Sequence, residues 1–525
     1  MPLNLVTDPW IPVRMVDGSR RTIRPDQIAE VGVARPDWPR ADLNLACYEL
    51  LIGLVHLADS PEDEEDWEER RRPDPGRLRE RMAPLAPAFD LDGDGPRFLQ
   101  DIEALGGTPN QVDLLFIDSA GESTAKKNAD LMVRRDRYDG LSLPEAAMAL
   151  YTFQSQAPSG GAGNRTSMRG GGPLLTLVEP RADGSAPSPL WDMVWANVPE
   201  GDPLPPDELA NAFPWMRATV TSKPPSGRSV QEGERTFPFA EAFFGMPRRL
   251  RLVFSDDEPR RVVGAVQQPW GTNYGLWRHP LTPYYRQKAG AEALPVHPRP
   301  GIESYRNWIG IAFEARGDLR EVAATVMTWG RRSRSLEPFA LHLGGWSMDN
   351  MKPRDFLWSR QPLFPLDKAG GEAATRLVRA ANAFALALSG AMRDVTSADA
   401  PDATAVEPLR EAFYERTQGA FEAMLSRLSG GEKLAAVPSG GEDGRPHGIA
   451  EDWRRTLRDV GMALFDEIAM PGLHARDITD AERIVAARGR LLAAFAGRGD
   501  KTGKAAFNEL GLPLPKKRDK VGAEA

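Results

Sequence analysis

Residues 373–393 read AATRLVRAANAFALALSGAMR, and this stretch decides the fold class of the second part of the chain. Its apolar stripe recurs at steps of three or four residues, at Leu377, Ala381, Phe384, Leu388 and Met392. That spacing places the stripe on one face of an α-helix. A helix with one apolar face must bury that face against another element, so the stretch predicts a helix within a larger helical assembly.

Three further stretches with the same periodicity follow, separated by breaks rich in Gly, Pro or Asp. The second runs from about Val406 to Leu428, and Thr479 is the predicted N-cap of the fourth. The apolar positions are Leu409, Phe413, Phe421 and Leu425 in the second stretch, Trp453, Leu457, Val460, Leu464 and Ile468 in the third, and Ile484, Ala487, Leu491 and Phe495 in the fourth. Four amphipathic helices with short links are typical of a four-helix bundle.

The chain before residue 370 has a different sequence pattern, because Gly and Pro clusters separate short segments of mixed helical and strand character. Ala41–Leu57 has the apolar spacing of a helix. Three segments have the composition of strands: Leu3–Val13, Leu174–Val178 and Arg249–Phe254. We therefore predict an α+β fold, with a large, irregular mixed α/β N-terminal domain over 1–370 and a C-terminal four-helix bundle over 371–525.

Composition excludes several classes of protein. The 525 residues carry 66 Lys and Arg against 74 Asp and Glu, a net charge of -8, which argues against charge-driven coating of nucleic acid. Cys47 is the single cysteine, so an internal disulfide framework and a cysteine-based zinc site are excluded, and a reducing cytosol is expected. No run of about 18 apolar residues and no secretory signal are seen. We expect a cytoplasmic protein without a membrane partner.

The most unusual segment is Ser159–Pro173, SGGAGNRTSMRGGGP, which holds six glycines and two arginines. Glycine allows positive φ and a close approach of the backbone to a ligand. Free N–H groups together with Arg165 and Arg169 would suit phosphates or a nucleic-acid groove. The spacing fits neither a Walker loop nor a dinucleotide fingerprint. A ligand-binding loop and a flexible surface loop both remain open interpretations.

A second motif is Gly344–Lys352, GGWSMDNMK, which places small and amide side chains in a turn. Asn can read base edges and Met can wedge between bases, but an Asx-stabilised turn explains the same residues. Basic clusters at Lys126-Lys127, Arg134-Arg135 and Arg331-Arg332 suit either phosphate contacts or a solvated face.

Catalytic and metal patterns are weak. No nucleophile elbow, HExxH helix or kinase set is present. The histidines in apolar or Pro-flanked settings are predicted to be structural: His279, His297 and His342. A spacing like that of a calcium loop, at Asp90, Asp92, Asp94 and Asp101, lacks the usual Glu and an entering helix, so an acidic turn is favoured. The absence of a catalytic constellation favours a binding protein over an enzyme.

Five motifs together resemble the CasA family, the large subunit of the type I-E CRISPR Cascade complex. They are Asn4–Val13 (NLVTDPWIPV), Gln156–Pro158, Arg169–Gly171, Gly275–Pro280 and Gly345–Lys352, and they occur in the family's order. The resemblance implies a non-catalytic subunit that recognises the protospacer-adjacent motif in duplex DNA, helps to split the strands for R-loop formation and helps to recruit a helicase-nuclease. It implies the other Cascade subunits and CRISPR RNA as partners, and no cofactor.

The resemblance also assigns DNA-contacting residues. The family's glycine loop falls on Gly161, Ala162 and Gly163, with Asn164 and Arg165 beside it, and Ala162 stands where the motif-contacting glycine is usual. The strand-separating wedge falls on Asp349, Asn350 and Met351, with Asn350 in the place of a glutamine. Gln268 stands in the place of a lysine finger, which suggests an altered motif preference.

A third element of the resemblance is the loop that reaches the guide RNA and a neighbouring subunit. It falls on Lys126–Val133, and its predicted contact residues are Lys126, Lys127, Asn128, Leu131 and Met132. No zinc is expected, because Cys47 cannot supply the cysteine cluster of some members. The alternative function is a phosphate- or nucleotide-handling enzyme that uses the Gly-rich loop, and a third interpretation is a purely structural scaffold.

Overall fold

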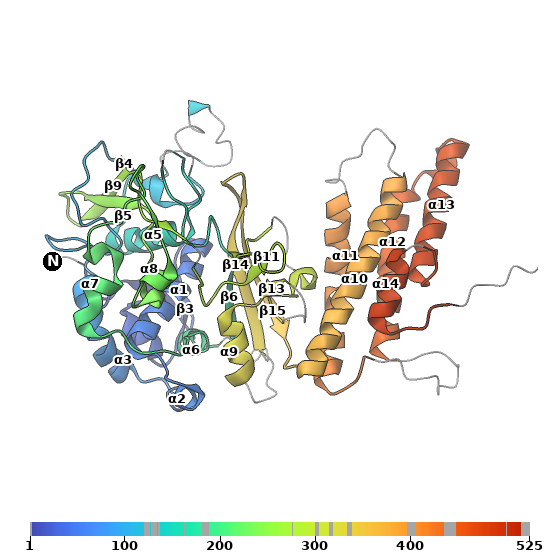
Figure 1. Ribbon diagram of the computed structural model, residues 1–525, viewed down its shortest axis with the longest axis horizontal. Helices are drawn as coiled ribbons and strands as arrows, with labels where there is room; N and C mark the ends of the chain where they lie inside the picture. The colour runs from blue at the N-terminus through green and yellow to red at the C-terminus, as the bar shows by residue number, and fades with distance from the viewer. Residues whose placement is uncertain are drawn as a thin grey trace, which may run out of the picture. The chain divides into compact units, whose positions relative to one another are not determined.

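A computed structural model describes most of the chain. The described residues are 3–119, 126–127, 134, 137–161, 163–180, 188–275, 277–299, 304–313, 319–332, 339–395, 406–434, 448–499 and 501–515. They form two compact units (Figure 1). The first unit comprises Met1–Pro300 and Leu319–Gln361, and the second comprises Gly301–Asp318 and Pro362–Ala525.

The first unit is built around the buried helix α1, Ala41–Asp59. This helix confirms the predicted one, and it is buried on nearly every side because apolar residues occur all round it. It is long and apolar enough to span a membrane, but 89% of its most apolar window is buried, as expected for a core helix. The other described helices of the unit are α2 (Glu64–Glu69), α3 (Pro75–Met82), α5 (Leu143–Gln156), α6 (Leu190–Trp195), α7 (Leu209–Ala212), α8 (Pro238–Phe244) and α9 (Ala324–Arg332).

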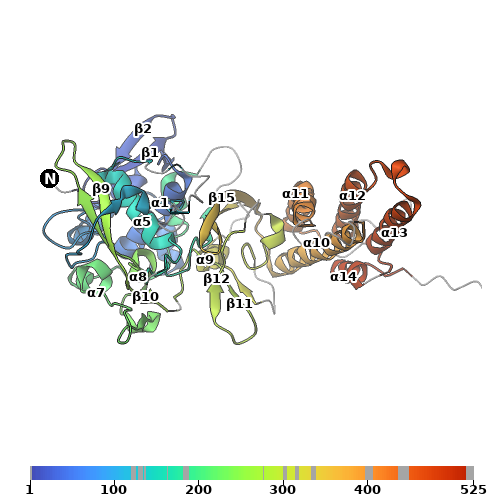
Figure 2. The same ribbon diagram turned by 90° about the horizontal axis from the view of Figure 1, so that it is seen from above.

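Several small sheets surround this core (Figure 2). One has the order β2-β1-β3, and another has β9 between β4 and β5, with β8 also paired to β9. A third has the order β15-β14-β6. The bounds are β1 Ile11–Met15, β2 Arg20–Ile23, β3 Val33–Pro36, β4 Asn110–Gln111, β5 Leu141–Ser142, β6 Leu175–Glu179, β7 Ser229–Val230, β8 Arg249–Phe254, β9 Arg261–Gln268, β10 Asn273–Tyr274, β11 Tyr284–Arg286, β12 Ala293–Pro295, β13 Arg320–Glu321, β14 Phe339–Asp349 and β15 Lys352–Leu363.

Two of the three predicted strands are confirmed, as β6 and β8. The predicted strand Leu3–Val13 is wrong over most of its length, because strand structure begins only at Ile11. The carboxamide oxygen of Asn4 accepts the backbone N–H groups of Val6 and Thr7, each at 3.0 Å. Asp8 in turn accepts the N–H of Asn4 at 2.9 Å. These bonds fold the segment into an Asx turn that competes with strand pairing.

The second unit is a helical assembly, which confirms the predicted fold class. Its helices are α10 (Lys368–Val395), α11 (Glu407–Ser429), α12 (Ile449–Ala469), α13 (Ile478–Phe495) and α14 (Lys501–Leu510). Helix α10 packs against the other four. The short α14 adds to the four predicted helices. The predicted N-cap Thr479 is wrong, since the carboxylate of Asp477 accepts the N–H of Asp480 at 2.8 Å and caps α13.

Residues 304–313 also belong to the second unit, although they precede its long helices by about 60 positions in the chain. Tyr305 stacks on Phe421 with ring centroids 4.3 Å apart, and its hydroxyl lies 2.7 Å from that of Thr417. Trp308 packs edge-on against the same phenylalanine. The division predicted at 370/371 stays a prediction. The compact units are divided in the chain after Gln361, and Gly301–Asp318 belongs to the second unit.

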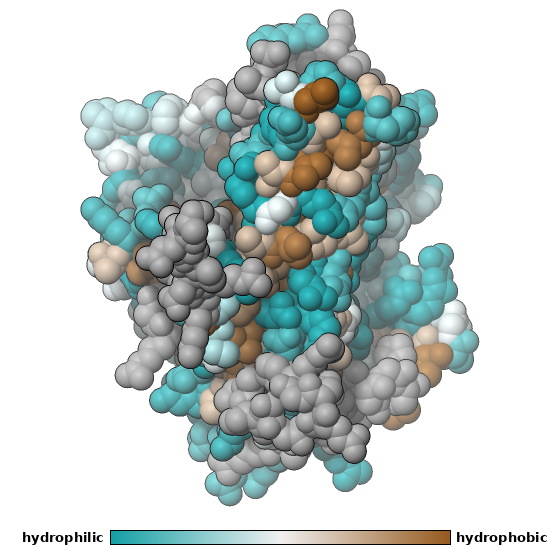
Figure 3. Space-filling model, turned by 90° about the vertical axis from the view of Figure 1, so that its right-hand side faces the viewer, coloured by the Kyte–Doolittle hydropathy of each residue, from teal (hydrophilic) through white to brown (hydrophobic). Residues whose placement is uncertain are grey.

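Not every stripe residue of the bundle is buried. Ile468 is half exposed, although its spacing predicts a core position. Helix α13 also exposes Ile478, Val485 and Leu492, which lie seven residues apart and so share one face. Figure 3 shows apolar patches among polar ones on the side of the molecule that carries α13.

Candidate nucleic-acid interface

The Gly-rich segment forms a closed loop with a small exposed turn at its tip. The N–H of Asn164 donates to the carbonyl of Gly161 at 2.7 Å, and the N–H of Gly160 donates to the carbonyl of Asn164 at 3.2 Å. Gly163 has φ +81, which glycine adopts without strain at the third position of such a turn. Gly161 is exposed, with φ +66 and open space around it. Ala162 lies outside the described residues.

One side of this turn rests on Trp270. The backbone N–H of Trp270 donates to the carbonyl of Gly163 at 2.9 Å, and a Cβ on Gly163 would lie 2.7 Å from the indole ring. Arg165 stacks over the same ring at 5.3 Å and donates to the hydroxyl of Ser222 at 2.7 Å. Trp270 is a residue that the sequence analysis missed, and the run Pro269-Trp270-Gly271 is the signal that could have found it.

Three predicted DNA-contacting side chains bind within the protein. The carboxamide oxygen of Asn164 accepts a hydrogen bond from Gln267 at 3.0 Å. Arg165 is held by Trp270 and Ser222 as described. Gln268, next along β9, donates to the carbonyl of Gly106 and is half-buried. The structure thus brings Gln267, and not Gln268, to the Gly turn, because successive side chains of a strand point to opposite faces. The contacts of Asn164, Arg165 and Gln268 with DNA stay predictions.

Arg169 does not lie on an exposed surface, so the structure does not support the interpretation that it contacts a phosphate. Its side chain is 2% exposed and forms an ion pair with Glu49 of α1, and it donates to the hydroxyl of Thr282 at 3.1 Å. The imidazole of His279 lies 3.2 Å from the same Glu49 carboxylate. The arginine and the histidine therefore tie two loops to the central helix, and His279 is structural, as predicted.

Burial controls the ionisation of this cluster. Desolvation, assisted by the charge of Arg169, lowers the pKa of His279 to about 4. Desolvation opposes ionisation of Glu49, but the charge of Arg169 and the hydrogen bond of His279 outweigh it and lower its pKa. His56, which is also buried, has a pKa lowered by desolvation to about 4.

These shifts predict acid sensitivity of the first unit. An unfolded chain protonates histidine near pH 6.5, whereas folded His56 and His279 stay neutral to about pH 4, so stability is lost as pH falls through that window. We expect each histidine to lower the free energy of unfolding by about 2 kcal/mol at pH 5 relative to pH 7. Urea unfolding at both pH values checks this. An equal stability at the two pH values would contradict the prediction.

The wedge motif forms the tip of a long β-hairpin. Strands β14 and β15 are joined by Asn350 and Met351 alone, with φ +48 and +63. Positive φ at both central residues defines a type I′ turn. Met351 is 55% exposed in this strained conformation, while Asp349 accepts from Asn350 at 3.0 Å and pairs with Arg354. An apolar side chain is therefore presented at the end of the hairpin.

Strand pairing joins the Gly-rich loop to the hairpin. The loop leads directly into β6, which pairs antiparallel with β14, and the last paired residues are Leu175 and Gly344. At about 3.3 Å per residue, the hairpin tip lies about 20 Å along the strand from Gly344. The hairpin and the strand that follows the Gly-rich loop, β6, thus belong to one sheet (Figure 1).

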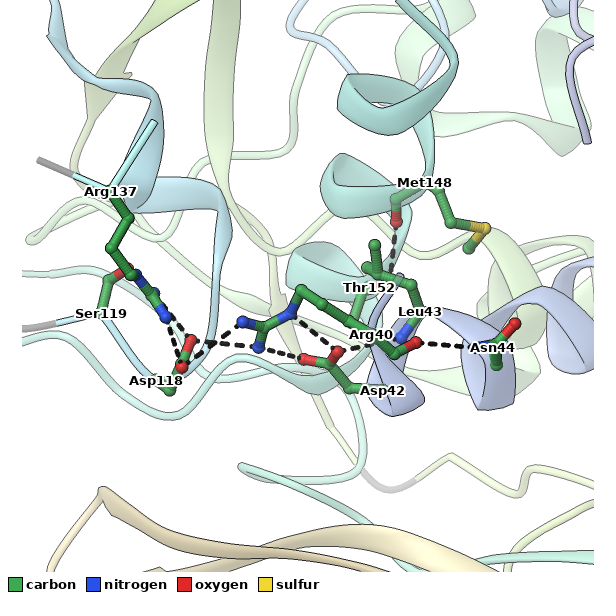
Figure 4. Close-up of polar contacts among 9 residues, drawn as sticks. All are labelled: Arg40, Asp42, Leu43, Asn44, Asp118, Ser119, Arg137, Met148 and Thr152. Atoms are coloured by element: carbon green, nitrogen blue, oxygen red, sulfur yellow. Dashed lines mark hydrogen bonds and ion pairs between the residues drawn. The ribbon is translucent and has the colours of Figure 1, made fainter. Parts of the chain in front are cut away.

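The predicted guide-RNA loop is described only in part. Lys126 and Lys127 are exposed, while Asn128, Leu131 and Met132 lie outside the described residues. Asp118 precedes the loop and Arg137 follows it, and the two residues form a bidentate ion pair (Figure 4). Arg137 donates to both carboxylate oxygens of Asp118, at 2.8 and 3.0 Å. Arg40 at the start of α1 donates to the same carboxylate at 3.1 Å. Desolvation opposes ionisation of Asp118, but these hydrogen bonds outweigh it and lower its pKa.

The calcium interpretation is not supported. Asp92 pairs with Arg260, and Asp101 accepts from Arg249 at 2.6 Å, so guanidinium groups occupy both carboxylates. Among the residues that the structure describes, no group of three or more His, Cys, Asp or Glu side chains is arranged to hold a metal ion.

The sequence matches the model of the family described as CRISPR-associated protein Cse1 over residues 4–464. The fold is similar to that of CasA from Thermus thermophilus, with 19% identity, a TM-score of 0.66 and coverage of 94% of this chain and 99% of that one. It is also similar to Thermobifida fusca Cse1, with 17% identity, a TM-score of 0.68 and coverage of 97% and 98%. A chain of a CRISPR RNA-guided surveillance complex gives 15% identity, a TM-score of 0.65 and coverage of 93% and 99%. These identities show a shared fold, and the family match spans most of the sequence, so the chain belongs to the family of CRISPR-associated Cse1 proteins and the indicated resemblance to CasA is confirmed.

Proposed function

We propose that this chain is the large subunit of a CRISPR RNA-guided surveillance complex, where it recognises the protospacer-adjacent motif in duplex DNA and starts strand separation. One observation carries the proposal. A small exposed turn at Gly161 and a hairpin tipped by Met351 belong to one unit and are joined through β6 and β14. One element is built to approach a duplex closely, and the other is built to insert into it.

The physics of duplex DNA supports both roles. The minor groove is about 6 Å wide and carries a degenerate code, so a side-chain-poor turn can enter it and tolerate variant motifs. Unstacking a base step costs a few kcal/mol, which an apolar wedge can offset. Because R-loop formation is otherwise nearly balanced, a modest contribution from Met351 decides whether it begins.

The proposed partners are the other Cascade subunits, CRISPR RNA, target duplex DNA and a helicase-nuclease recruited after R-loop formation. The guide RNA is proposed to meet the segment Lys126–Val133. The chain acts as a non-catalytic subunit in the cytoplasm, without a cofactor. Family membership and the similarity to a chain of a CRISPR RNA-guided surveillance complex support this assembly.

Co-purification of the chain with the other subunits and a guide RNA, followed by binding to a duplex library with randomised flanking bases, tests the proposal. Enrichment of a short flanking motif is expected. Binding that ignores the flanking bases would instead indicate a structural scaffold. Nucleotide binding or substrate turnover by the isolated chain would indicate the alternative, a phosphate-handling enzyme.

The exposed turn offers a matched test. Gly161 and Gly290 are both exposed glycines with positive φ and open surroundings, so either position accepts a new side chain with similar backbone strain. Gly161→Asp places a negative charge at the groove and should lower motif-dependent DNA affinity at least tenfold, whereas Gly290→Asp should not. Electrophoretic mobility shift of the assembled complex measures both. Equal affinity of the two variants would show that the turn is a spacer.

A further inference from the structure

The two ends of the Gly-rich loop, Gln156–Pro158 and Gly171-Gly172, meet through backbone atoms, and we call them the neck of the loop. The N–H of Gly172 donates to the carbonyl of Gln156 at 2.8 Å, so the outgoing limb of the loop meets the incoming one. A Cβ added to Gly171 would lie 2.7 Å from Cα of Pro158. A non-bonded contact of a Cβ below 3.0 Å is essentially never seen, so the limbs are packed backbone to backbone. The exposed turn is therefore carried on a rigid base.

The same neck presses on the root of the hairpin. A Cβ on Gly172, which has φ +63, would lie 2.7 Å from Cβ of Trp346 and closer still to its carbonyl oxygen. From the other side, a Cβ on Gly345 would lie 3.0 Å from the ring of Pro298 and closer still to the carbonyl oxygen of Pro173. These contacts continue the line of β6 and β14 beyond their last paired residues. We call Gly172 and Gly345, with the backbone they touch, the glycine seam.

We infer that the glycine seam fixes the position of the strand-separating hairpin relative to the motif-reading turn, which makes Gly172 and Gly345 positioning residues for strand separation. This inference rests on the proposed function. Functional groups need to be held to about 0.5 Å. The closest contacts of the seam are to the carbonyl oxygens of Trp346 and Pro173, and these backbone atoms have no alternative rotamer. A single methyl group in the seam must move one element by about 1 Å to reach a normal C···O separation.

When the seam is altered, motif recognition by the turn is expected to persist while strand separation by the hairpin is lost. A duplex with the motif but no complementarity to the guide reports motif recognition alone. A complementary duplex reports R-loop formation. A target whose two DNA strands are mismatched with each other next to the motif, but whose target strand still matches the guide, needs no strand separation there. The assembled complex can be compared on all three, with Gly290→Ala as the control for positive φ in open space.

For Gly172→Ala and Gly345→Ala we expect motif discrimination within twofold of the parent, an R-loop rate at least tenfold lower, and recovery to within twofold on the mismatched target. An unchanged R-loop rate, or a parallel loss of motif discrimination and R-loop formation without recovery, would overturn the inference. A parent complex without motif discrimination would instead refute the proposed function, so the two failures are distinguishable.

If Gly172→Ala and Gly345→Ala both prevent folding, a second variant that leaves the seam intact tests the same inference. Insertion of two residues into each strand of the hairpin beyond Ser347 keeps the alternation of its faces and moves the tip by about 6.6 Å. The inserted residues lie in the exposed end of the hairpin, near Asp349 and Arg354. The same pattern of retained discrimination, slow R-loop formation and recovery is expected. A parental R-loop rate in this variant would show that the position of the tip is not fixed relative to the turn.

Discussion

A chain carrying Met351→Gly is expected to form R-loops at least tenfold more slowly than the parent, and to unfold at the same or a higher temperature. The loss follows from removal of the only apolar side chain at the described tip of the hairpin, where unstacking a base step costs a few kcal/mol. A change of 1.4 kcal/mol in the barrier already gives a tenfold effect.

The free energy of unfolding of this variant should not decrease, so a slower R-loop rate cannot be attributed to unfolding. A left-handed backbone conformation costs a side chain such as Met351 about 1–2 kcal/mol, and glycine relieves this strain. The resulting Asn-Gly pair is the preferred sequence for a type I′ turn. Glycine is therefore a better probe than alanine, which would keep the strain.

Stopped-flow fluorescence of a base analogue beside the motif measures the rate, and thermal unfolding measures the stability. Met351→Leu keeps an apolar side chain and should retain most of the R-loop rate. If Met351→Gly opened the duplex as fast as the parent, Met351 would not be the wedge, and the turn would serve only to join β14 and β15.

Arg169→Met is expected to lower the free energy of unfolding by about 3–5 kcal/mol, the usual result of breaking a buried ion pair. The substitution leaves the Glu49 carboxylate fully buried without its guanidinium partner, with the imidazole of His279 at 3.2 Å. It also frees the neck of the Gly-rich loop from α1. Urea unfolding of the intact chain, followed by tryptophan fluorescence, gives the change.

The matched control removes both charges. Glu49→Gln combined with Arg169→Met leaves no uncompensated carboxylate, so the double variant should recover more than half of the stability lost in the single one. A cost below about 1 kcal/mol for Arg169→Met would show that the pair does not hold the loop. Equal losses in the single and double variants would place the effect in packing of the arginine stem instead.

The helices were predictable because their signal is local. The stripe from Leu377 to Met392 recurs with the helical period, and α10 contains it. The strand β8 was predicted with its observed bounds for a similar reason. The predicted strand at the N-terminus failed because Asn4 and Asp8 bond to nearby backbone groups, and this competition is invisible to apolar alternation. Residues 304–313 joined the helical unit through Tyr305 and Trp308, whose partner Phe421 is more than 100 positions away.

The sequence by itself determined the fold class, the family and the motifs at Gly161 and Met351. The helical period is a local signal, and the family's motifs occur in their order along the chain. Only the tertiary structure decided what the arginines of the Gly-rich loop do. Arg165 stacks on Trp270 and Arg169 is buried against Glu49, although both occur in one exposed-looking segment. The physical reason is that a guanidinium can pair with any carboxylate or ring the fold brings near it, and those partners lie far away in the chain.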